Sequence, residues 1–181
     1  MVNSRDGQMV HIALAPNYTV RGVVKKELSD IKAGDYVAST SVRGTDGKLH
    51  SLADYHGHPL VLFFFPKAFT GTCERQISGH AQHIADFDAL GAKVVGVSTD
   101  HTPSQSAFKK GCDPDNKVVL LSDFRHVAVK AYGIHVAEGQ LPNQRATFII
   151  DGDGVVRHAH VESSPGDWAG IEPELAALRA L

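Results

Sequence analysis

Continuous apolar runs alternate along the chain with segments in which apolar residues recur every three or four positions. Residues 60–65 form one such run, which predicts a central strand buried on both faces of a sheet. Helical spacing follows residue 73 and stops at Gly91, which predicts one amphipathic helix. Residues 93–98 and 117–123 predict two further buried strands.

Turn and cap signals divide the rest of the chain. Asp46-Gly47 predicts one hairpin, and Asp151 opens a second, which joins two strands within residues 146–162. Pro103 suits the first turn of a helix that runs to about residue 110, with Thr102 as its cap. Residues 126–133 predict a short helix, and residues 167–181 predict a closing one. This order of elements predicts a three-layer α/β domain with a mixed central sheet.

The N-terminal part has a different pattern. Residues 10–14 and 18–24 predict short strands, and a polar, turn-rich segment follows them. We therefore divide the chain into an N-terminal extension, residues 1–33, and one domain, residues 34–181. The extension is interpreted as a strap or hairpin packed on the domain, with a partner-binding arm as the alternative. Residues 9–15 are apolar but short and interrupted by His11, so we expect no secretory signal peptide.

Composition narrows the function classes. With 43% hydrophobic and 21% charged residues, the 181-residue chain can bury a real core. A net charge of −2 gives no reason to expect nucleic acid or an anionic membrane as a partner. Two cysteines form neither a disulfide framework nor a four-cysteine metal site, which favours a reducing, cytoplasmic setting.

One of the two cysteines lies where a thiol becomes reactive. Cys73 follows the apolar strand and falls in the first turn of the next helix, where the helix dipole and free backbone N–H groups favour thiolate. Pro66 ends the strand without needing an N–H partner. Gly71 and Thr72 are small enough to admit a substrate, and the Thr70 hydroxyl can donate to or accept from a bound oxygen.

These residues form the pattern Pro-x-x-x-Thr-x-x-Cys, which resembles the signature of the peroxiredoxins. The stretch FFFPKAFTGTC is similar to one-cysteine peroxiredoxins of the alkyl hydroperoxide reductase E type, close to the bacterioferritin-comigratory-protein-like group. LLSDF, VAVKAYG and QRATFIIDGDGVVR resemble later parts of the same family, so the resemblance runs from about residue 32 to the C-terminus. The sequence departs from the family after Gly34, where DYVASTSV lacks the usual proline and phenylalanine. The resemblance implies a thioredoxin-like fold and cofactor-free reduction of hydroperoxides.

The resemblance also implies a role for each matching residue. Cys73 is the peroxidatic cysteine, whose thiolate attacks a peroxide oxygen and becomes sulfenic acid. Thr70 positions the peroxide, and Pro66 shields the sulfur from water. Arg145 stabilises the thiolate and the stretched O–O bond, and Gln76 hydrogen-bonds to that arginine.

Cys112 leaves two mechanisms open. Some peroxiredoxins of the bacterioferritin-comigratory type keep a resolving cysteine in the preceding helix, whereas Cys112 follows Gly111 and is expected in a loop. If Cys112 resolves the sulfenic acid, the protein is a two-cysteine peroxiredoxin. Otherwise an external thiol reduces it, either a thioredoxin- or glutaredoxin-like protein or a low-molecular-weight thiol. The family also implies a homodimer as one assembly.

The sequence also bears on three other functions. A thioredoxin-class disulfide oxidoreductase needs Cys-x-x-Cys, and this chain has Cys-Glu-Arg-Gln at that position. A non-catalytic redox-sensing or scaffold module of the same fold remains an alternative. A metal site is not expected, because His80 with His83, or His158 with His160, would supply only half a ligand set.

Overall fold

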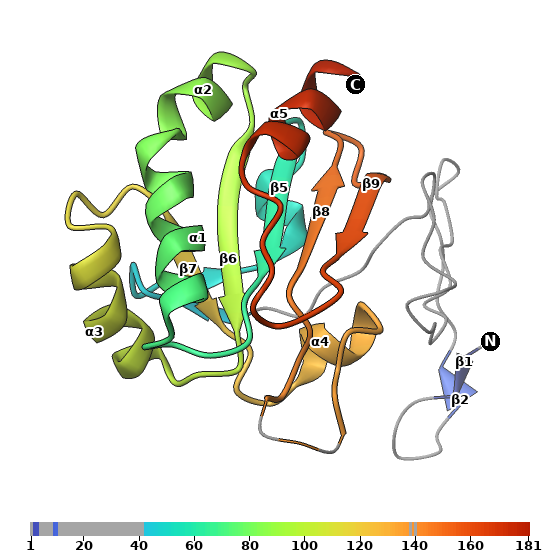
Figure 1. Cartoon of the computed structure of the whole chain (residues 1–181). Helices are drawn as coiled ribbons and strands as arrows, with labels where there is room; N and C mark the ends of the chain where they lie inside the picture. Colours follow the sequence, from blue (N-terminus) through green and yellow to red (C-terminus); the bar gives the residue numbers. More distant parts are fainter. Residues whose placement is uncertain (1, 4–8, 11–41, 138, 140) are drawn as a thin grey trace.

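The computed structural model describes residues 2–3, 9–10, 42–137, 139 and 141–181 (Figure 1). Seven strands form one sheet in the order β4-β3-β7-β6-β5-β8-β9. β5, β6 and β7 are parallel, and the other pairings are antiparallel, so the mixed sheet expected from the sequence is confirmed. The strands are β3 (Val42–Gly44), β4 (Leu49–His50), β5 (Leu60–Phe64), β6 (Lys93–Ser98), β7 (Val119–Ser122), β8 (Ala146–Ile150) and β9 (Val156–Val161). A separate antiparallel pair joins β1 (Val2–Asn3) to β2 (Met9–Val10).

Helices cover both faces of the sheet, which makes the three layers. α1, α2, α3 and α5 pack on one face and α4 on the other, because their buried side chains fall into two separate apolar cores (Figure 1). The helices are α1 (Gly71–Gln82), α2 (Ile84–Ala89), α3 (Thr102–Cys112), α4 (Val127–Ala131) and α5 (Glu172–Arg179), with a 3-10 turn at Leu52–Tyr55.

β5 shows why the central run is apolar throughout. Successive strand residues point to opposite faces, so Phe63 and Phe65 enter one core while Leu62 and Phe64 enter the other. All residues of β5 are buried. The loop that follows β5 is therefore fixed by packing from both sides.

Three predicted helix boundaries were wrong. The helix expected to run to Gly91 is two helices, because His83 has φ −98° and ψ 13°, outside the helical region, and separates α1 from α2. α3 begins at Thr102 with His101 as its N-cap, and it extends to Cys112. The closing helix starts only at residue 172, since Gly170 (φ 88°) is in the left-handed region.

The division into an extension and a domain stays a prediction. Apart from Val10, the strands expected over residues 10–14 and 18–24 lie outside the described residues. In the part of the chain that the structure describes, no helix is both long and apolar enough to cross a bilayer.

Gly96 in β6 leaves room for Phe63 and Leu120 in the core on one face of the sheet, and its replacement should be costly. A Cβ there would lie 2.5 Å from Phe63 Cζ and 2.7 Å from Leu120 Cδ2. We expect Gly96→Ala to lower the free energy of unfolding by about 1–3 kcal/mol. Gly111→Ala is the control, because no neighbouring atom lies within 4 Å and alanine suits a helix better. Chemical denaturation that finds equal stability in the two variants would contradict this packing argument.

Candidate active site

Cys73 lies in the first turn of α1, as the sequence predicts, and is only 1% exposed. The chain leaves β5 through the buried Pro66 and turns at Phe69, which has φ 60°. Thr70 is the N-cap, and its carbonyl accepts the hydrogen bond from Glu74 N at 2.9 Å that starts the helix. The strand, the tight turn and the cap together place the sulfur at the N-terminal end of the helix.

The active-site loop is held by a residue that the sequence reading missed. Asp100, just after β6, accepts a 2.8 Å hydrogen bond from Ala68 N and a 2.9 Å bond from Ser98 Oγ. The loop after β5 is thereby tied to the end of the neighbouring strand. The only signal for Asp100 was its place after an apolar run, which many surface carboxylates share.

Thr70 is exposed at the rim of the site. Its Oγ1 donates to Lys67 O at 2.9 Å, so the hydroxyl hydrogen is already committed. The oxygen lone pairs remain for accepting a hydrogen bond. Of the two roles that the sequence left open, the geometry therefore favours Thr70 as an acceptor from a bound O–H group.

Arg145 comes from the start of β8, the strand paired with β5, and reaches the sulfur. It directly precedes β8, is 2% exposed, and its Nη2 donates to Cys73 Sγ at 3.4 Å. The same nitrogen donates to Pro165 O at 2.9 Å, and Nη1 donates to Gln76 Oε1. Gln76 is fully buried, not exposed on the helix surface. The structure thus brings together Cys73, Gln76 and Arg145, with Pro66 and Thr70 on the loop before the helix.

The segment after β9 completes the wall around Arg145. Besides Pro165 O, it contributes Gly166 O, which accepts from Thr72 Oγ1 at 3.3 Å. Glu162 N in turn donates to Arg145 O at 3.0 Å. The sequence marks a Pro-Gly turn here but does not show that the Pro165 carbonyl accepts from the arginine. These contacts hold the guanidinium in place while leaving it adjacent to the sulfur.

Two positive features face the sulfur of Cys73. A buried guanidinium that donates to a thiolate makes a charge-assisted hydrogen bond, which is stronger than a neutral one. The positive end of the α1 dipole adds to this from the backbone side. A nucleophilic thiolate beside a cationic donor can attack an electrophilic oxygen while the donor stabilises the charge that leaves.

Cys112 was expected in a loop, and this was wrong. It is the last residue of α3 and is 6% exposed, with its Sγ donating to Phe108 O at 3.3 Å. Its backbone oxygen accepts from Ser78 Oγ at 3.0 Å, which fixes this end of α3 against α1. Burial raises the pKa of the Cys112 thiol to about 11, so it is protonated at neutral pH. Both cysteines are free thiols.

The histidines of α1 have different partners. His80 is buried and contacts Gln76 O and Glu174 Oε2, both at 2.8 Å, whereas the exposed His83 contacts Asp86 Oδ2. Their side chains are therefore engaged in separate contacts. Within the described ranges, no group of three or more His, Cys, Asp or Glu residues could hold a metal ion.

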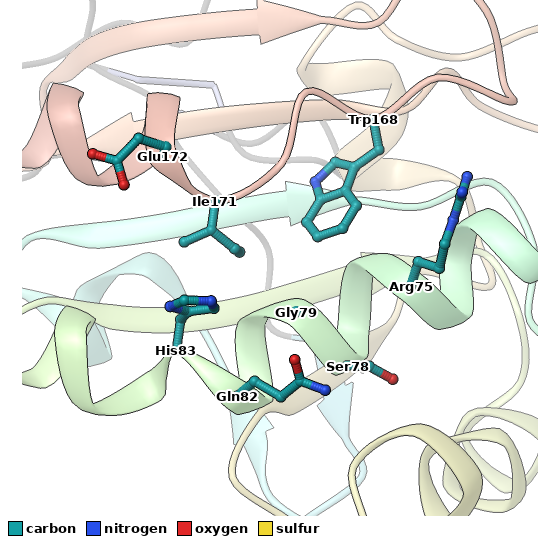
Figure 2. Close-up of a pocket in the computed structure, with 8 residues that line it drawn as sticks. All are labelled: Arg75, Ser78, Gly79, Gln82, His83, Trp168, Ile171 and Glu172. Carbon is teal, nitrogen blue, oxygen red and sulfur yellow. The ribbon is translucent and has the colours of Figure 1, made fainter.

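A groove of about 510 Å³ runs along one flank of α1 (Figure 2). Trp168 lies over Gly79 in its middle, Arg75 is at one end, and Glu172 and His83 are at the other (Figure 2). Cys73 does not line it. A substrate of a few atoms needs no cavity of this size, so we place the chemistry at Cys73 and not in the groove.

The fold and this site define a class: a thioredoxin-like α/β protein with a thiol at a helix N-terminus that contacts a buried arginine. Comparison with known proteins identifies the family. A family model described as AhpC/TSA family matches residues 33–159. The chain is 35% identical over 146 residues to the probable peroxiredoxin prdx-3 of Caenorhabditis elegans, covering 78% of this chain and 64% of that relative. The chain belongs to the AhpC/TSA family.

Bacterial relatives and solved structures agree. Peroxiredoxin Bcp of Escherichia coli is 29% identical over 136 residues, which cover 72% of this chain and 86% of that protein. The crystal structure of peroxidoxin BcpB from Mycobacterium tuberculosis has a TM-score of 0.74 and 31% identity, covering 83% of this chain and 98% of that one. The resemblance to peroxiredoxins and the thioredoxin-like fold are thereby confirmed. The protein is a thiol-dependent peroxidase, an oxidoreductase that uses a hydroperoxide and a thiol reductant.

Proposed function

We propose that Cys73 is the peroxidatic cysteine of a one-cysteine peroxidase that reduces hydrogen peroxide and organic hydroperoxides. The thiolate attacks one peroxide oxygen, the O–O bond breaks, and the cysteine becomes sulfenic acid. The departing oxygen takes up a proton and leaves as water or an alcohol. The observation that carries the proposal is the 3.4 Å contact between Arg145 Nη2 and Cys73 Sγ, because one donor there stabilises both the thiolate and the breaking bond.

The neighbouring residues are assigned supporting roles. Thr70 accepts a hydrogen bond from the peroxide O–H and so orients it for attack, consistent with its committed hydroxyl hydrogen. Pro66 is buried before the loop and shields the sulfur from water. Gln76 holds Arg145 through its side-chain oxygen. Each role is supported by a contact or by burial in the described residues.

An external thiol closes the cycle. It condenses with the sulfenic acid to a mixed disulfide and water, and a second thiol releases Cys73 as a thiol and leaves as a disulfide. A thioredoxin- or glutaredoxin-like protein or a low-molecular-weight thiol can fill this role. The support is that Cys112 is buried and protonated, and is thus a poor resolving nucleophile.

The proposal includes a homodimeric assembly and a cytoplasmic location. A homodimer is the assembly we propose, and the exposed aromatic side chains Phe69, at 68%, and Phe124, at 54%, are candidates for its contact surface. The two free thiols support a reducing cytoplasm.

Mass spectrometry after one equivalent of hydrogen peroxide tests this proposal. We expect wild type and Cys112→Ser alike to gain one oxygen atom on Cys73, trapped by a sulfenic-acid reagent. The reason is that Cys112 is not needed for the first step and does not resolve it. A disulfide between residues 73 and 112 in the wild type would instead establish the two-cysteine alternative. Absence of oxidation at Cys73 would overturn the assignment.

A further inference from the structure

His80 and Glu174 form a buried polar pair that the reaction described above does not use. Their side chains are 0% and 6% exposed. The imidazole is stacked on Phe63 with ring centroids 4.1 Å apart, and Phe87 and Trp168 lie 5.8 Å and 6.2 Å away. Burying such a pair among aromatic rings is costly unless every polar atom finds a partner.

The contacts determine where the protons are. His80 Nδ1 lies 2.8 Å from Gln76 O, and a carbonyl can only accept, so Nδ1 carries a hydrogen. His80 Nε2 lies 2.8 Å from Glu174 Oε2, and one proton is shared between them. Glu174 Oε1 accepts from Thr147 Oγ1 at 3.1 Å. Both ring nitrogens and both carboxylate oxygens are therefore hydrogen-bonded.

The two helix termini suit the placement of these side chains. His80 is in the last turn of α1, where the dipole is negative, and Glu174 is in the first turn of α5, where it is positive. The two helices thus meet through opposite ends. The pair therefore fixes the position of α1 relative to α5 more specifically than apolar packing alone would.

The contacts close a ring through the active site. Arg145 binds the Gln76 side chain, the Gln76 carbonyl binds His80, and His80 binds Glu174. Glu174 returns the ring to Thr147 on β8, two residues after Arg145 and therefore on the same face of the sheet. α1 is consequently tied to one short segment of chain at two places, and its position sets the distance from Cys73 to Arg145.

We propose that His80 and Glu174 are positioning residues for the peroxidatic site, acting through Gln76 and the placement of α1. The inference rests on the proposed function, since it assumes that the contact between Arg145 and Cys73 is catalytic. Cys73 and Gln76 both lie on α1, so a shift of α1 relative to β8 changes the 3.4 Å distance from Arg145 Nη2 to Cys73 Sγ. Breaking the ring slows oxidation of Cys73 without touching the sulfur or the arginine.

Two variants of Glu174 test whether the hydrogen bonds of its side chain affect the oxidation of Cys73. Glu174→Ala removes both bonds of the carboxylate, and we expect the second-order rate constant for Cys73 oxidation to fall about tenfold or more. Glu174→Gln keeps both hydrogen bonds, because its side-chain oxygen can accept from Thr147 and its amide N–H can donate to His80 Nε2. We expect its rate constant for Cys73 oxidation to be within about threefold of wild type. Glu172→Ala, on the exposed side of the same helix, is the control and should react as wild type.

Thr147 supplies a second pair in case Glu174→Ala does not fold. Thr147→Val is nearly isosteric and cuts only the bond to Glu174, whereas Thr147→Ser retains it. We expect the valine variant to be slower than wild type and the serine variant to match it. Stopped-flow fluorescence follows the reaction, because Trp168 is the only tryptophan and lies near His80. Each rate constant is taken on protein shown to be folded by circular dichroism.

The possible results distinguish failure of this inference from failure of the proposed function. Wild-type rates in Glu174→Ala and Thr147→Val would overturn the inference and leave the proposed function intact. Glu174→Gln as slow as Glu174→Ala would also overturn it, since hydrogen bonding would then not carry the effect. If wild type itself reacts no faster than free cysteine, the proposed function fails, and the inference fails with it.

Discussion

Replacing Cys73 by serine is expected to abolish peroxide consumption. The serine hydroxyl fills nearly the same buried space, but it is not ionised at neutral pH and cannot form a sulfenic acid. The arginine and the loop remain, yet they have no nucleophile to act on. The measurement is loss of hydrogen peroxide over time in the presence of a thiol reductant, with the variant compared to wild type.

Cys112→Ser is the matched control, because it removes the other thiol and should keep turnover. Turnover in Cys73→Ser would show that the reaction takes place elsewhere. The non-catalytic alternative predicts a third pattern, in which wild type is oxidised at Cys73 once but consumes no further peroxide with any thiol. That result would make the protein a redox sensor on the same fold.

Replacing Arg145 by alanine should slow peroxide reduction by about 10²–10³, the scale of losing one donor to a transition state. The variant loses the donor to Cys73 Sγ, and it leaves Gln76 Oε1 without Nη1 and Pro165 O without Nη2 as donors. The rate constant for oxidation of Cys73 under pseudo-first-order peroxide is the quantity to measure. We expect the loss in the chemical step, since the guanidinium lies beside the sulfur.

Arg157→Ala is the control for this prediction. Arg157 lies on β9, has a half-exposed side chain, and pairs with Asp151 away from the sulfur. We expect its removal to leave the rate unchanged. Near-normal oxidation in Arg145→Ala would remove that residue from the mechanism, and an equal loss in both variants would point to general destabilisation.

The sequence predicted the parts of the fold that depend on local pattern. The apolar run over residues 60–65 is β5 with one further buried residue, and the turn signal at Asp151 does join β8 to β9. The position of Cys73 in a first helical turn also follows from the pattern around it. Arg145 was found through the family resemblance, because nothing in its local sequence distinguishes it from a surface arginine.

Contacts between distant segments could not be predicted in this way. His80 and Glu174 are 94 residues apart, and hydrophobic periodicity treats both as polar surface positions. The burial of Cys112 depends on how α3 packs against α1, which the composition of its own helix does not reveal. The break at His83 likewise reflects tertiary packing, since the apolar spacing continues through it.

The burial of Cys73 means that its two chemical partners reach it by different routes. With 1% of the residue exposed, a molecule of two oxygen atoms needs only a brief local fluctuation to make contact. A thiol carried on another protein is far bulkier, and we expect it to reach the sulfur only after the first turn of α1 has opened. Under the proposed function we therefore expect oxidation in the closed helix and regeneration in the open one. If oxidation of Cys73 is fast, the turnover rate is then set by how often the first turn of α1 opens.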